Sequence, residues 1–144
     1  MAAALLDASL VVLLGVVTVS DLRTRLVPDR PLFASLALAL VLYGLFAPSQ
    51  LPDRLAAGAA AAGVLLAAAL VRPDGMGLGD VKLAGVLGVY LGAAVVEAMV
   101  VAFAAGSVVG LVLIARHGWA ARSRTIAFAP CLALGGLVAM ALRL

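Results

Sequence analysis

Long apolar runs alternate with short polar segments along the whole chain. Six of the runs approach the roughly 20 residues that an α-helix needs to cross a bilayer. They cover Ala2–Ser20, Pro31–Ala47, Arg54–Val71, Asp80 to about Val95, Glu97–Ala115 and Thr125–Leu142. The pattern therefore predicts an all-α fold, a polytopic membrane helix bundle of about six transmembrane helices. Residues 1–144 are expected to form a single membrane-embedded domain.

Two of these runs carry further structural signals. Pro31 suits the first turn of a helix, where its missing N–H needs no partner, and Asp29 with Arg30 is expected to cap that helix. The third run is rich in alanine, and small side chains let membrane helices approach closely. It is therefore expected inside the bundle.

The composition agrees with a membrane protein. Hydrophobic residues make up 66% of the chain, charged residues make up 12%, and the mean hydropathy is +1.25. Soluble domains are about half apolar and about a quarter charged. The net charge of +3 does not indicate nucleic-acid binding, because the basic residues lie in short segments between apolar runs. Cys131 is the only cysteine, so neither a disulfide within the chain nor a cysteine-built metal site is expected. No cofactor is expected either.

The distribution of basic residues predicts the orientation in the membrane. With six spans, one side carries eight of the ten lysines and arginines: Arg23, Arg25, Arg30, Arg72, Lys82, Arg116, Arg122 and Arg124. Arg54 and Arg143 fall on the other side. By the positive-inside rule the first side is cytoplasmic and both termini are outside. The short fourth run could instead form a re-entrant hairpin, but that would move three arginines outside.

Two aspartates next to apolar runs are the candidates for chemistry. Asp80 ends the glycine-rich segment Gly75–Asp80, and Asp21 follows the first run. Six spans would bring both to the same membrane surface. Ionisable residues near a span are costly unless they face protein, water or a partner. Two carboxylates in a poorly solvated site do not both ionise easily, so one keeps its proton, as in aspartyl proteases.

Structural alternatives remain open for each residue. Asp80 could be a helix N-cap, and Asp21 could belong to an interfacial charge cluster with its neighbouring arginines. Lys82 could bind a lipid phosphate. Gly77 and Gly79 permit unusual backbone conformations and would leave room for an extended substrate backbone.

Three segments resemble motifs of one family. Gly75–Leu83, continuing through Gly85, Gly88 and Gly92, closely resembles the second active-site motif of the type IV prepilin peptidases, which are GxGD-type aspartyl proteases. Ser20–Asp29 resembles their first motif, an aspartate followed by basic residues and a Pro-Asn or Pro-Asp pair. Ile126–Gly135 looks like their last-helix signature, with alanines where proline and glycine are common.

The resemblance implies a function and a location. Asp21 and Asp80 would be the catalytic pair, and Gly77, Gly79, Lys82, Pro28 and Asp29 would belong to the motifs that the substrate approaches. The reaction would remove the leader of prepilin or pseudopilin precursors at the cytoplasmic face of the cell membrane. Such substrates carry a short charged leader ending in glycine, followed by an apolar helix.

The chain is similar to the short, peptidase-only forms of tight-adherence or Flp pilus systems, because it lacks the cysteine-rich domain of larger members. Two other functions remain possible from the sequence. One is a membrane scaffold of a pilus or secretion assembly, in which the acids only cap helices. The other is a proton-coupled transporter, which would require a carboxylate near the bilayer midplane.

Overall fold

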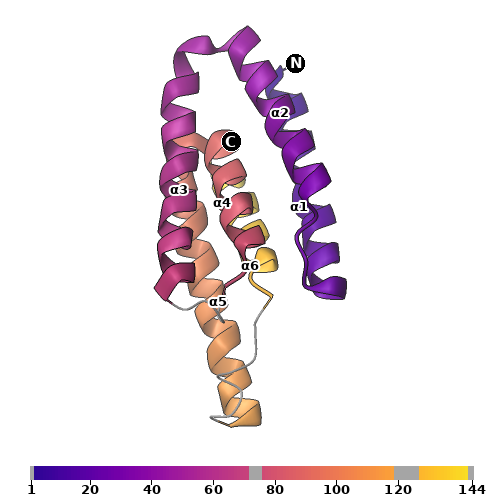
Figure 1. The fold of residues 1–144 in the computed structure, drawn as a ribbon, viewed down its shortest axis with the longest axis vertical. Coiled ribbons are helices and arrows are strands. Elements are labelled where there is room, and N and C mark those ends of the chain that lie inside the picture. The colour runs from indigo at the N-terminus through magenta and orange to yellow at the C-terminus, as the bar shows by residue number, and fades with distance from the viewer. Residues whose placement is uncertain (1, 72–75, 119–126, 143–144) are drawn as a thin grey trace.

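The computed structural model describes residues 2–71, 76–118 and 127–142, which form a bundle of α-helices (Figure 1). The helices are α1 (Ala2–Thr24), α2 (Asp29–Phe46), α3 (Leu51–Val71), α4 (Leu78–Leu91), α5 (Val95–His117) and α6 (Ala129–Ala141). Two 3-10 turns, η1 (Pro48–Gln50) and η2 (Gly92–Ala94), precede α3 and α5. No strand occurs in the described ranges, so the all-α prediction is confirmed. Gly75, Arg72, Arg122 and Arg124 lie outside these ranges.

Four helical segments are long and apolar enough to cross a membrane. They are Ala3–Thr24, Asp29–Phe46, Pro48–Val71 and Leu78–His117, the last of which contains α4, η2 and α5. α4 has 14 residues and α6 has 13. At a rise of 1.5 Å per residue each is about 20 Å long, shorter than the roughly 30 Å of a hydrocarbon core. The chain is therefore a multi-pass membrane protein, and two of the six α-helices in its described ranges are short.

The short helix α4 is the centre of the bundle. Of its residues, Asp80, Val81, Leu83, Ala84 and 86–91 are buried, because α2, α3 and α6 all pack against it. The expectation that the alanine-rich third run lies inside was wrong. α3 buries only Gly58, Ala61, Leu65 and Ala69, since its small residues bring one face close to α4 and leave the rest of the helix exposed.

Glycines allow α3 and α4 to touch through their backbones. A Cβ atom at Gly58 would lie 2.7 Å from the carbonyl oxygen of Gly85. A Cβ atom at Gly88 would lie 2.6 Å from the backbone nitrogen of Gly58. Both distances are shorter than any ordinary contact, so the helices can approach this closely only with glycine at these positions.

The C-terminal end of α4 is bound by side chains of α2 and α3. Tyr90 and Leu91 are buried, and the last carbonyls of a helix have no partner within the helix. The Nη1 atom of Arg54 donates to the carbonyl oxygens of Tyr90 and Val89, at 2.7 and 3.3 Å. The Tyr43 hydroxyl also donates to the Tyr90 oxygen, at 3.1 Å. Arg54, which the sequence identified only as an external charge, therefore caps α4 where a cation suits the helix dipole.

The helix directions bring several helix ends together. α1 ends, and α2, α4 and α6 begin, toward the same end of the bundle (Figure 1). α5 extends beyond this end, and its second half carries exposed Val108, Leu111 and Val112. The segments that contain the two sequence motifs therefore meet at one end.

Candidate active site

A cavity of about 400 Å³ lies where the two motifs meet. The end of α1 and the segment that follows it form one wall, and the start of α4 forms another. Residues just before α6 also line the cavity. Its lining consists of Asp21, Arg25, Leu26, Val27, Asp29, Gly77, Leu78, Gly79, Asp80, Lys82, Ala127 and Phe128. The structure thus brings together six of the seven expected site residues, all except Pro28.

Asp21 and Asp80 are the only charged side chains that are buried among the described residues. Asp21 is 6% exposed and Asp80 is 7% exposed. They lie close enough for their charges to interact. The Oδ2 atom of Asp21 and the Oδ1 atom of Asp80 are both buried without a hydrogen-bond partner in the described part of the chain. A buried polar oxygen without a partner is costly, so the pair is poorly explained by stability alone.

The structural alternatives for both aspartates do not fit. The N-cap of α4 is Gly77, without a side-chain cap bond, and Asp80 is the third helical residue. Its backbone N–H donates to the Gly77 carbonyl at 3.1 Å. Asp21 is buried, whereas the neighbouring Arg23 and Arg25 are exposed, so Asp21 is not part of an interfacial charge cluster.

The segment after Asp21 is folded back by local hydrogen bonds. Arg25 adopts a left-handed conformation with φ of 54°, and its N–H donates to the Asp21 carbonyl at 2.9 Å. The Ser20 hydroxyl donates to the Leu26 carbonyl at 2.9 Å. These contacts end α1 and turn the chain toward the start of α4.

The two glycines of the second motif differ in their surroundings. A Cβ atom at Gly77 would meet nothing closer than 3.9 Å, with the Oδ2 atom of Asp80 among its nearest atoms. A Cβ atom at Gly79 would lie 2.7 Å from the Val27 Cβ atom. Space for a substrate backbone is therefore present at Gly77, whereas Gly79 is required by the contact with Val27.

Asp29 does not cap α2, contrary to the expectation. Pro28 is the N-cap residue, with φ of −71° and ψ of 125°, and Asp29 is the first residue of the helix. Proline already fixes the extended backbone that a helix start needs, which leaves the Asp29 carboxylate free to bind elsewhere. Its Oδ1 atom accepts a hydrogen bond from the Lys82 Nζ atom at 2.8 Å.

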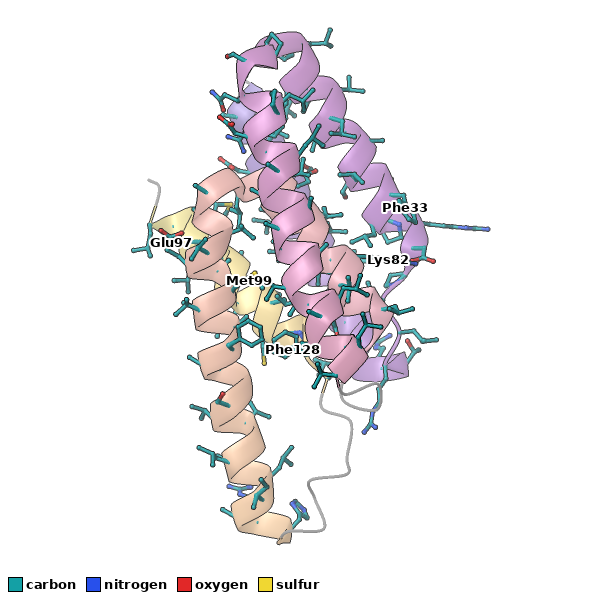
Figure 2. The ribbon with its side chains drawn as sticks, turned by 60° about the vertical axis from the view of Figure 1, so that its left-hand side comes forward. Phe33, Lys82, Glu97, Met99 and Phe128 are labelled. Carbon is teal, nitrogen blue, oxygen red and sulfur yellow. The ribbon has the colours of Figure 1, made fainter. Side chains whose placement is uncertain are left out.

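The cavity contains residues that the sequence did not single out as site residues: Arg25, Leu26, Val27, Leu78, Ala127 and Phe128. The first four lie inside the two quoted motifs. Ala127 and Phe128 lie in the segment that resembles the last-helix signature, which was the signal for them. Phe128 lies beside α5 (Figure 2), with its ring 5.7 Å from that of Phe103.

The donor set of the cavity suits proton transfer. Among the described residues, no group of three or more histidines, cysteines or carboxylates could hold a metal ion. Two buried carboxylates that line one cavity can take a proton from water and give one to a carbonyl or an amine.

The comparison with known proteins found a matching family. Residues 8–115 match the sequence model of the type IV leader peptidase family. The matched region contains both motifs and runs from α1 into the second half of α5. No curated protein and no solved structure shows significant similarity to the chain. From the match over most of its length, the chain belongs to the type IV leader peptidase family.

Proposed function

We propose that this peptidase is of the aspartic type and removes the leader of prepilin or pseudopilin precursors with Asp21 and Asp80 as its catalytic pair. One observation carries the proposal. Two buried carboxylates, 59 positions apart in the sequence, line a single cavity, and each has an oxygen without a hydrogen-bond partner in the described part of the chain. Membership in the leader peptidase family supports the class of substrate.

The pair would work by general acid–base catalysis. Two neighbouring carboxylates away from bulk water hold one proton between them and titrate as a unit. The ionised partner takes a proton from water, and the resulting hydroxide attacks the carbonyl carbon of the scissile bond. The protonated partner donates a hydrogen bond to the carbonyl oxygen, and a proton then passes to the departing amine.

The two other functions have less support. A scaffold would gain nothing from two buried carboxylate oxygens without partners, because such groups reduce stability. A transporter would need carboxylates that connect the two sides of the membrane. Both aspartates instead lie at the end of the bundle where α1 ends and α4 begins.

A cleavage assay with the purified protein tests the function. The substrate is a precursor with a short charged leader ending in glycine and a following apolar helix, reconstituted with the protein in detergent or liposomes. We expect one cut after the glycine, identified by the masses of both products. A folded protein that leaves several such precursors intact would favour the scaffold.

A labelling experiment tests the proposed orientation, in which the cavity faces the cytoplasm. Cys131 is buried and can be replaced by alanine, so that single cysteines at Leu78 and Gln50 become the only reactive positions. Leu78 is exposed at the cavity and Gln50 is exposed in η1 at the other end of the bundle. A membrane-impermeant maleimide should label Gln50→Cys in intact cells and Leu78→Cys only after the membrane is opened. The reverse pattern would place the cavity outside.

A further inference from the structure

Two contacts join the two motifs to each other, one just before and one just after Asp80 in the sequence. Val27 packs against Gly79, one residue before the aspartate, and Asp29 pairs with Lys82, two residues after it. Both Val27 and Asp29 belong to the short stretch of chain that begins at Asp21. The start of α4 is therefore attached to the segment that carries the other carboxylate.

The ion pair has a defined geometry although it is accessible to solvent. The Nζ atom of Lys82 lies 2.8 Å from the Asp29 Oδ1 atom, and the two side chains are 44% and 56% exposed. The same nitrogen lies 5.8 Å from the centre of the Phe33 ring, within the range of a cation–π contact. Asp29 and Phe33 are four residues apart and so lie on one face of α2. Figure 2 shows Lys82 and Phe33 on the same side of the bundle.

We propose that the ion pair of Asp29 and Lys82, here called the clasp, fixes the position of Asp21 relative to Asp80. The two residues would then act as positioning residues of the catalytic pair. The segment from Asp21 to Asp29 joins the last turn of α1 to the first residue of α2, and Val27 and Asp29 attach it to α4. Lys82 is on the first turns of α4, where a displacement moves Asp80 directly. The catalytic part of this inference rests on the proposed function.

The clasp is expected to affect the placement of the two aspartates and not the stability of the whole bundle. Exposed ion pairs add little to the stability of a whole protein, so breaking this one should leave the bundle folded. Misplacement of reacting groups by about 1 Å can reduce a rate by about 100-fold. The expected consequence of losing the pair is therefore a slower chemical step in a protein of unchanged melting temperature.

A double-mutant cycle tests the clasp through activity. Asp29→Asn and Lys82→Met should each lower kcat by about 10- to 100-fold, with a smaller effect on KM, and the double variant should be no slower than the slower single variant. Lys82→Arg should keep most of the activity because it retains the charge. Arg30→Met, which removes an exposed charge next to Asp29, is the matched control and should resemble the parent. Losses that multiply in the double variant, or full activity in both single variants, would overturn the proposal.

A distance measurement tests the clasp without relying on catalysis. Nitroxide labels at Leu26→Cys and Leu78→Cys, in the Cys131→Ala protein, report the separation of the two walls of the cavity. Both leucines are exposed, at 69% and 64%. Lys82→Met and Asp29→Asn should broaden or lengthen the distribution of distances, and Arg30→Met should not. If the parent cleaves no precursor the proposed function fails, and this measurement still decides on the clasp: an unchanged distribution in both variants would refute it.

Discussion

Asp80→Asn and Asp21→Asn should each abolish precursor cleavage while leaving the protein folded and inserted in the membrane. Asparagine has nearly the same size as aspartate but cannot accept and return a proton. General acid–base groups contribute about 10²–10⁴-fold to a rate, and we expect a loss of that size from either change. Removing a buried charge should not lower stability, because the amide is less costly to bury than a carboxylate. Turnover of a purified precursor and the melting temperature in detergent provide the two measurements.

Asp53→Asn is the matched control for these variants. Asp53 lies in the first turn of α3 and is exposed, at the other end of the bundle from the cavity. The variant loses the same charge and should cleave at the parental rate. Activity near the parental level in either Asp21→Asn or Asp80→Asn would exclude the proposed pair.

Gly58→Ala should destabilise the bundle and slow cleavage together. The added methyl group would lie 2.7 Å from the Gly85 carbonyl oxygen and 2.9 Å from a Val89 methyl group, so α3 and α4 must move apart. Overpacking of this kind typically costs about 1–3 kcal/mol. Because α4 also carries Asp80, the displacement should reach the cavity. Unfolding in a denaturing detergent and precursor turnover would report the two effects.

Gly63→Ala separates this packing effect from any general effect of alanine in a helix. Gly63 lies on the same helix, and a Cβ atom there would meet nothing within 4 Å. Alanine should be neutral or slightly stabilising at that position, since it restricts the unfolded chain and favours the helix. Equal behaviour of the two variants would contradict the close contact between α3 and α4.

The helices followed from local patterns in the sequence, and the meeting of the two aspartates at one end followed from the number of spans between them. The apolar runs located the six α-helices that the structure describes, because a segment that crosses lipid must satisfy its backbone within a helix. The short polar segments after Asp21 and before Asp80 identified the ends where the motifs lie. Both signals are contained in a few consecutive residues, and such signals can be read without knowing which helices are neighbours.

The relations between distant segments could not be predicted in this way. All the runs are apolar on every side, so nothing in the sequence indicated that α4 is surrounded by the others while α3 faces outward. Arg54 caps α4 through backbone carbonyls 35 and 36 residues away, and every residue type has a carbonyl, so the sequence carries no sign of this contact. The roles of Gly79 and Lys82 likewise depend on Val27 and Asp29, more than 50 residues earlier.

Because Arg54 and Tyr43 hold the C-terminal end of α4, the length of this helix fixes the position of Asp80 at the other end. Ten residues separate Asp80 from Tyr90, whose carbonyl accepts both hydrogen bonds, and at 1.5 Å per residue they measure about 15 Å. One residue more or less would turn Asp80 by about 100° around the helix axis while the other end stayed in place. In the proposed function, the length of this single helix would therefore set the distance of the catalytic pair from the opposite end of the bundle, and with it the depth at which a membrane-bound precursor is cut.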